Sequence, residues 1–172
     1  MRTSLEVKRS TLFLNFTNGR RDLCILAGQI PDSAHSQVFL GTWSLLDIFA
    51  HLIGWDETNQ EAIQAVTAGR LPDFYQWIDK DWQTYNARLV GMYKKGTLPE
   101  LITAALTSQA RLIARLSSLP AGDLFRDFGV RRRGYKVTLA RLIEAETGDE
   151  KIHLEQVKDF WQHCQQQDRS NT

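Results

Sequence analysis

The sequence has little cysteine and almost no excess charge. Its two cysteines, Cys24 and Cys164, lie far apart, and no CxxC or Cys/His finger spacing is present. A disulfide framework and a zinc finger are therefore excluded, and a reducing cytoplasm is the simplest compartment. The 21 basic side chains nearly balance the 20 acidic ones, for a net charge of +1. That balance argues against a dedicated nucleic-acid binder and against a polybasic membrane anchor.

Long hydrophobic runs are also lacking. Near the N-terminus the longest is Leu12–Leu14, which is too short for a signal peptide or a membrane span. No GxSxG nucleophile elbow occurs, so a serine hydrolase of that type is excluded. We expect a cytoplasmic protein that takes neither a membrane nor a nucleic acid as its partner.

What is present is helical periodicity over most of the 172 residues. Apolar residues recur every three or four positions, and no segment alternates for long as a strand would. The predicted helices cover approximately 4–28, 44–69, 79–95, 97–120 and 138 onward. Residues 70–82 are expected to form an ordered crossover with some helix, and residues 165–172 a disordered tail. The length fits one domain over residues 1–172.

Two helix starts carry capping boxes. Ser44 is followed by Asp47 and Thr97 by Glu100, so in each pair a hydroxyl and a carboxylate can satisfy the free amides of a first turn. Ser44 is thus read as a cap and not as a nucleophile. Amphipathic helices of this length pack most economically as an all-α four-helix bundle, here with a long crossover between its second and third helices.

The last helix carries a polar island on its apolar stripe. When the helix is projected at 100° per residue, Glu146, Asp149, Glu150 and His153 fall between apolar turns on the core-facing side. Carboxylates in a bundle core cost several kcal/mol each unless something compensates them. A cation, a wet cleft or buried basic partners would do so.

A divalent metal is one such compensation. Asp149 and His153 are four residues apart, and His51 lies at the edge of the apolar stripe of the second helix. Together these three side chains would suit Zn, Ni, Mn or Fe and leave positions open for water or substrate. Glu146 or Glu150 could then act as the catalytic base or orient a ligand histidine.

Other interpretations stay open. In the first, the bundle core tapers at this level; in the second, Gly148 turns the carboxylates to solvent; in the third, the basic cluster of residues 131–133, or Lys136, folds back onto them. That cluster could also hold an anionic substrate or thiol cofactor, although a solvated loop is favoured. A ferritin-like di-iron centre is excluded because the Glu150-x-x-His153 step has no counterpart at His51.

A substrate pocket beside His51 is predicted from polar and aromatic side chains. Core packing would account for most of the aromatic residues equally well. The residues assigned to the pocket are Trp55, Asn59, Tyr75 and Trp82.

One segment carries a family pattern. The residues Trp43-Ser44-x-x-Asp47-x-x-x-His51-x-x-x-Trp55 resemble a recurring helix of the DinB/YfiT-like superfamily, and more narrowly of its DfsB (ClbS-like) branch. The segments Pro72-Asp73-Phe74-Tyr75 and Asp81-Trp82-x-x-Tyr85-Asn86 are similar to the same branch. The resemblance spans roughly residues 4–162.

The resemblance implies a four-helix bundle that is commonly homodimeric. It also implies a divalent metal held by one histidine of the second helix and an H-x-x-x-H pair of the fourth. His51 and His153 match that pattern, whereas Asp149 stands where the family has the first histidine of the pair. Implied activities are hydrolysis or thiol transfer on a small electrophilic molecule, of a detoxification or resistance type. The alternative is a non-catalytic bundle that binds or sequesters a small ligand.

Overall fold

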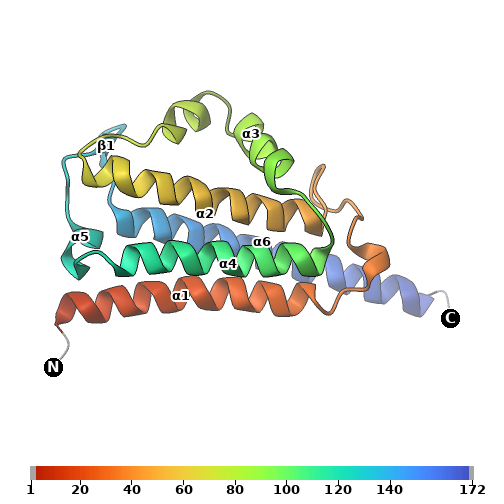
Figure 1. Ribbon diagram of the computed structural model, residues 1–172. Coiled ribbons are helices and arrows are strands. Elements are labelled where there is room, and N and C mark those ends of the chain that lie inside the picture. Colours follow the sequence, from red (N-terminus) through yellow and green to blue (C-terminus); the bar gives the residue numbers. More distant parts are fainter. Residues whose placement is uncertain (1–2, 171–172) are drawn as a thin grey trace.

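Four long helices packed side by side make up the body of the protein. The computed structural model describes residues 3–170, apart from the side chains of Ile78 and of residues 167–170. The four bundle helices are α1 (Ser4–Ala27), α2 (Leu45–Thr67), α4 (Leu98–Ser117) and α6 (Leu139–Ser170) (Figure 1). The predicted all-α bundle is confirmed. Within the described residues, no helix is sufficiently long and apolar to cross a membrane.

The predicted crossover is a helix in its own right. Helix α3 (Phe74–Tyr93) runs back along the outside of α2, so that α2 and α4 point the same way while α1 and α6 point the opposite way (Figure 1). The helix begins at Phe74 and not near residue 79, as the sequence had predicted. It is kinked at Asp81, whose backbone is extended (φ −159°, ψ 87°). A single turn of 3₁₀ helix, Asp32–Ala34, lies between α1 and α2.

Both predicted capping boxes are confirmed. The Asp47 carboxylate accepts hydrogen bonds from the Ser44 amide at 2.8 Å and the Ser44 hydroxyl at 2.6 Å, and Lys94 lies 2.8 Å from it. The Thr97 amide donates to Glu100 in the same way at 2.7 Å. These contacts satisfy amides that have no partner inside the helix and so set where α2 and α4 begin.

The connection from α4 to α6 contains elements that the periodicity did not predict. A short helix, α5 (Ala121–Phe125), precedes a hairpin of two strands, β1 (Arg131–Arg132) and β2 (Tyr135–Lys136). The turn places Arg133 (φ 48°) and Gly134 (φ 84°) in the left-handed region, as a tight hairpin requires. Strands of two residues are too short to show an alternating pattern.

Helix α6 is longer than predicted. It continues through Ser170, so residues 165–170 are helical where a disordered tail was expected. Glutamines at 165–167 are good helix formers, and neither glycine nor proline interrupts this end of the chain. The last two residues of the expected tail, 171–172, lie outside the described part.

The core is divided into two hydrophobic clusters by a layer of polar residues. One cluster surrounds Phe16, Val66 and Leu112, and the other surrounds Leu23, Phe49 and Leu101. Each bundle helix contributes to both clusters. Between them it places buried polar side chains at the same level of the bundle: Arg20 from α1, Asp56 and Asn59 from α2, Ser108 and Gln109 from α4, and Glu146 and Glu150 from α6.

Gly54 permits the close approach of α3 to α2. A methyl group at this position would lie 2.7 Å from the Cβ atom of Leu89, closer than two carbon atoms can pack. We expect Gly54→Ala to lower the free energy of unfolding by about 1–3 kcal/mol in urea denaturation. Gly91→Ala on α3 is the control, since its methyl would meet nothing within 4 Å; it should stabilise the protein by about 0.5–1 kcal/mol. Equal effects of the two substitutions would contradict this close packing.

Candidate metal centre

Three side chains from two helices converge beneath α3. His51 comes from α2, and Asp149 and His153 come from successive turns of one face of α6. Asp149 Oδ2 lies 3.0 Å from His51 Nε2 and 3.3 Å from His153 Nε2. One potential ligand atom from each residue lies within 4.8 Å of the other two. The structure thus brings together the three residues predicted to hold a metal.

The hydrogen bonds around His153 define its state. Its Nδ1 lies 2.8 Å from the acceptor Gln156 Oε1 and therefore carries a hydrogen. Its Nε2 is buried without a hydrogen-bond partner, although Asp149 Oδ2 is its near neighbour. This nitrogen and the carboxylate oxygen face each other, an arrangement that a shared proton or a cation stabilises. His51 Nδ1 is likewise buried without a partner.

The electrostatics of the group favour a neutral histidine beside an ionised carboxylate. Burial lowers the pKa of His51, and its contact with Asp149 offsets only part of that shift. Burial by itself would raise the pKa of Asp149, but the two imidazoles more than offset it and hold that pKa well below its usual range. Neutral imidazole and ionised carboxylate are the forms that bind metal ions.

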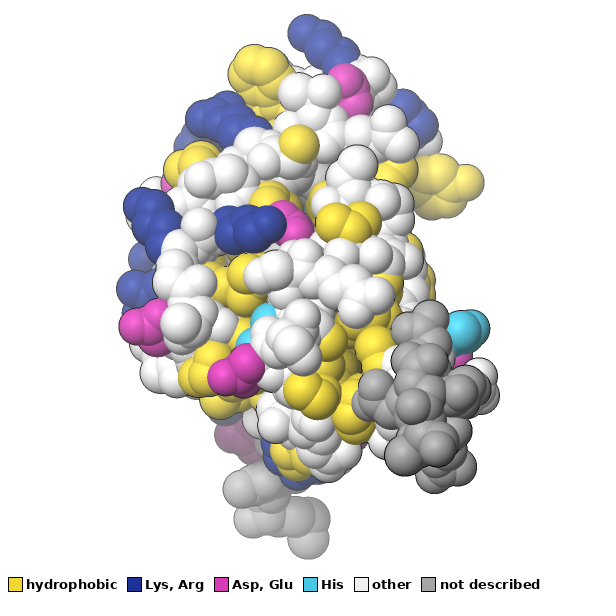
Figure 2. Space-filling view, turned by 90° about the vertical axis from the view of Figure 1, so that its right-hand side faces the viewer, with side chains coloured by type: hydrophobic (Ala, Val, Ile, Leu, Met, Phe, Trp, Pro, Cys, Tyr) yellow, Lys and Arg dark blue, Asp and Glu magenta, His cyan; other side chains and the backbone are white. Residues whose placement is uncertain are grey.

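The three residues lie in a cleft of about 720 Å³ between α2, α3, α6 and the loop before α2. Figure 2 shows that hydrophobic side chains are exposed on the end of the bundle toward which α1 and α6 run. Trp43 closes one side: its ring centroid lies 4.9 Å from that of His51 and 6.1 Å from that of His153. The rest of the lining is mostly uncharged and includes Leu40, Trp82, Gln83, Thr84, Asn86 and Ile152.

The residues predicted to form the substrate pocket fall in different places. Trp82 lines the cleft. Trp55 packs edge-on against His51, with ring centroids 6.3 Å apart, and donates to Asn86 Oδ1 at 3.0 Å. Asn59 is buried in the polar layer, with its Nδ2 unpartnered. Tyr75 lies by the hairpin, beneath the Arg132 guanidinium. The structure does not bring Asn59 or Tyr75 to the cleft.

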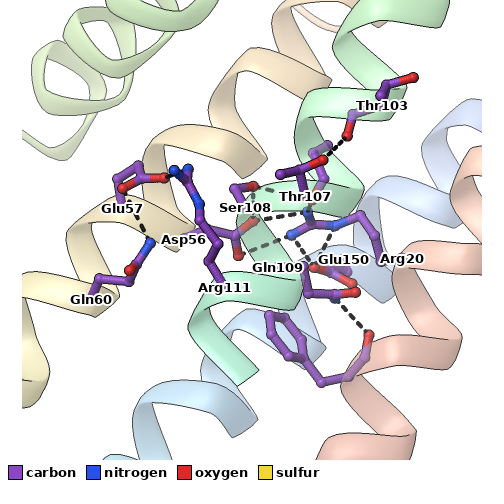
Figure 3. Close-up of polar contacts among 12 residues, drawn as sticks. Arg20, Asp56, Glu57, Gln60, Thr103, Thr107, Ser108, Gln109, Arg111 and Glu150 are labelled. Atoms are coloured by element: carbon purple, nitrogen blue, oxygen red, sulfur yellow. Dashed lines mark hydrogen bonds and ion pairs between the residues drawn. The ribbon is translucent and has the colours of Figure 1, made fainter. Parts of the chain in front are cut away.

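Glu150 points away from the cleft toward α1. Its Oε1 accepts hydrogen bonds from Arg20 Nε at 2.9 Å and Nη2 at 2.5 Å, while Arg20 Nη1 lies 3.0 Å from Asp56 Oδ2. The Ser108 hydroxyl also donates to Asp56, at 2.5 Å. Figure 3 shows how Arg20 reaches between the helices to join both carboxylates. Arg20, Asp56 and Glu150 all have fully buried side chains.

Glu146 is buried one turn before Asp149 and does not line the cleft. Its Oε2 has no hydrogen-bond partner. Burial first, and then the negative charge of Asp149, raises the pKa of Glu146 well above its ordinary value. The carboxyl group is therefore held in its neutral form. The structure gives neither Glu146 nor Glu150 the access to the cleft that a catalytic base requires.

Residues that the sequence did not single out complete the site. Arg20 compensates the buried carboxylates of Asp56 and Glu150. Its position in the sequence suggested only a solvent-facing polar residue of the first helix. Trp43 was part of the family pattern but had no assigned role. Gln156 could have been found from its spacing, because a side chain three residues after His153 lies on the same face of the helix.

The basic cluster does not pair with the carboxylates of α6. Arg131 bonds Asp127 at 2.7 Å, whereas Arg132 and Arg133 both reach Asp79 on α3. The interpretation that residues 131–133 compensate the polar island is wrong. Arg20, from the neighbouring helix α1, fills that role instead.

Fold and site together define a four-helix bundle with a potential His–Asp–His metal site between its second and fourth helices. The chain belongs to the DinB superfamily, whose family model matches residues 15–157. Its fold is similar to that of a solved structure titled "Sibling Lethal Factor Precursor - DfsB", with a TM-score of 0.74 and 16% sequence identity over 90% of this chain and 95% of the other. The resemblance noted in the sequence is thereby confirmed at the level of superfamily and fold. No curated protein sequence matches the chain.

Proposed function

We propose that the protein is a divalent-metal-dependent enzyme that acts on a small electrophilic molecule. His51, Asp149 and His153 would hold the metal. Three protein ligands with further positions left open are characteristic of catalytic metal sites. The cleft above the three residues gives a small molecule access to those open positions.

The observation that carries this proposal is the convergence of three potential ligand atoms within 4.8 Å of one another. His153 Nε2 and Asp149 Oδ2 lie 3.3 Å apart, and this nitrogen is buried without a hydrogen-bond partner. Neighbouring ligand atoms in a tetrahedral site with bonds of about 2.0–2.1 Å are separated by about the same distance. The residues present therefore fit a small divalent cation.

The donor set narrows the choice of metal. Two imidazoles and one carboxylate suit Zn, Ni, Mn or Fe, and the carboxylate makes the site harder than three imidazoles would. A bound divalent metal lowers the pKa of water and polarises an electrophile. Gln156 would fix the orientation of His153 through Nδ1. Trp43 would restrict the access of water from its side.

Apart from a bound metal, the described part of the cleft provides no positive charge that would hold an anionic substrate. Among the described residues that line it, Asp149 carries the only full charge, and neither lysine nor arginine is present. Trp82 and Ile152 would hold an apolar body, while Gln83 and Thr84 offer polar groups at the edge. A thiol cofactor bearing carboxylates would find no cationic partner in this lining, so we favour hydrolysis over thiol transfer.

The second candidate function is non-catalytic binding or sequestering. An ionised Asp149 beside the aromatic rings of Trp43 and Trp82 could hold an organic cation without any metal. A thermal-shift screen separates the two candidates. Stabilisation by Zn, Ni or Mn supports the metal site, whereas stabilisation by an organic cation alone supports sequestering.

Metal titration of untagged protein tests the proposed site directly. We expect calorimetry to show about one site per chain in the parent, and at least about 100-fold weaker binding in His51→Ala and His153→Ala, because loss of a ligand should exceed the effect of losing its hydrogen-bonded support. His163→Ala is the matched control, since His163 is an exposed histidine of α6 that bonds only the Asp159 carbonyl. Its affinity should be unchanged.

Activity is tested on the same variants. The metal-loaded parent should hydrolyse members of a panel of uncharged esters, lactones, amides and epoxides, and His153→Ala should not. Unchanged metal affinity in both site variants would overturn the metal centre. Metal binding without turnover of any panel member would overturn the hydrolytic assignment.

A further inference from the structure

A second hollow of about 260 Å³ lies at the hairpin. Figure 1 places β1 near the first turns of α3, at the end of the bundle where α6 begins. Tyr75, Tyr135 and Val137 contribute to its lining, and all its remaining lining residues are cationic: Arg132, Arg133, Lys136 and Arg141. No described carboxylate lines it, and it shares no lining residue with the cleft of the candidate metal centre.

Arg132 is held rigidly in the wall of this hollow. Its guanidinium lies 4.5 Å from the centroid of the Tyr75 ring, and its Nη2 bonds the Asp79 carboxylate. Its Nε is buried and has no hydrogen-bond partner. A fixed guanidinium that lines the hollow is suited to a planar or tetrahedral oxyanion, because little side-chain entropy is lost when the anion binds.

The cations around the hollow outnumber the carboxylates that neutralise them. Asp79 is shared by Arg132 and Arg133. Asp127 is shared by Arg131 and Lys136, the latter at 3.2 Å. Arg141 donates to the Lys136 carbonyl oxygen at 2.8 Å, and no ion pair to a described carboxylate is found for it. Because these cations outnumber the two carboxylates, an excess of positive charge remains around the hollow.

The backbone of the hairpin adds a further indication. Arg133 has the left-handed conformation (φ 48°) that the hairpin turn requires, which is unfavourable for a residue with a side chain. Glycine or asparagine would relieve that strain. The arginine places its charge 3.1 Å from Asp79 at the rim, so the strained position carries one of the cations.

We propose that this hollow binds a small anionic molecule through a phosphate or carboxylate group. Arg132 and Arg141 are its principal donors, and the rings of Tyr75 and Tyr135 face the remainder of the ligand. The volume suits a small metabolite. A nucleic acid is disfavoured, because a net charge of +1 provides no extended basic surface. The proposal is independent of the metal centre.

Calorimetric titration of the full chain with inorganic phosphate, adenosine monophosphate and citrate tests it. We expect saturable binding of at least one probe with a Kd of about 1 mM or tighter. Arg132→Gln and Arg141→Gln should each weaken that binding at least about tenfold, which is the loss of one charge-assisted contact. Arg126→Gln, an exposed arginine paired with Asp123, should leave it unchanged. The preference for citrate or for the phosphates identifies which anion is recognised.

A substitution of opposite sign strengthens the test. Asp79→Asn removes the negative charge beside Arg132, while the stacking on Tyr75 still holds its guanidinium, and should tighten binding; Asp123→Asn changes net charge equally and should have a smaller effect. His51→Ala should not alter binding of the anion. Three outcomes would overturn the proposal: no saturable binding of any probe, equal losses in Arg141→Gln and Arg126→Gln, or salt-dependent binding of DNA in place of the small anions. Circular dichroism verifies that each variant is folded.

Discussion

Replacing Arg20 with methionine should lower the free energy of unfolding by about 3–5 kcal/mol, the usual cost of leaving buried charges without their partner. Arg20 bridges Asp56 and Glu150 in the polar layer and also donates to the Ala105 carbonyl oxygen at 2.7 Å. Without it, two carboxyl groups from different helices remain in the bundle interior. Chemical denaturation followed by circular dichroism measures the loss.

Arg21→Met is the matched control for this prediction. Arg21 is the next residue of α1. It forms an ion pair with Asp22 in which both side chains are exposed to solvent. Its loss should therefore change stability by no more than about 1 kcal/mol. The triple variant Arg20→Met, Asp56→Leu, Glu150→Met should recover much of the loss, because it removes the buried charges altogether. Equal destabilisation by Arg20→Met and Arg21→Met would show that the polar layer does not hold the helices together.

Changing Asp149 should move metal affinity in two directions. Asp149→Asn removes the negative charge and should weaken Zn binding by about 100-fold or more, beyond the effect of losing a supporting residue. Asp149→His completes a set of three imidazoles and should tighten Zn binding by about tenfold or more, since imidazole suits Zn. The carboxylate is partly exposed, so a larger ring has room to turn toward the cleft. Competition titrations measure both changes.

The absorption spectrum of bound Co²⁺ provides a second readout, because it reports the ligand set directly. The absorption bands of bound Co²⁺ should shift in wavelength in Asp149→His and lose intensity in Asp149→Asn. Asp159→Asn, on the same helix and outside the cleft, is the control for the change in charge. If both Asp149 variants bind Zn as the parent does, Asp149 is not a ligand and the proposed centre is wrong.

Local chemistry explains which parts of the fold could be predicted. The starts of α2 and α4 were predicted because Ser44–Asp47 and Thr97–Glu100 satisfy first-turn amides within three residues. The hairpin was not predicted, since strands of two residues have no period. The kink at Asp81 was also not predicted, although its cause is local: the Asp81 carboxylate accepts hydrogen bonds from the Thr84 amide at 3.0 Å and the Thr84 hydroxyl at 2.5 Å and so caps the second part of α3.

The candidate site was predicted in part. Helical spacing placed Asp149 and His153 together, and the position of His51 at the edge of the apolar stripe of the second helix added the third ligand, as the family pattern also did. The partner of Glu150 could not be predicted, because Arg20 lies 130 residues away in the sequence and looks like any polar residue of an amphipathic helix. The same limit applies to Glu146, whose neutral state follows from complete burial and from the charge of Asp149.

Local sequence chemistry was sufficient to predict that this chain forms long amphipathic helices, where most of them start, and that an acidic and imidazole island interrupts the last one. The division of that island follows from how the helices pack. One side of α6 turns Asp149 and His153 toward His51 and a cleft, whereas the adjacent side turns Glu150 toward Arg20 in the core. A helix presents residues 149 and 150 about 100° apart, so its packing against α1 and α2 separates a candidate reactive centre from a structural ion pair.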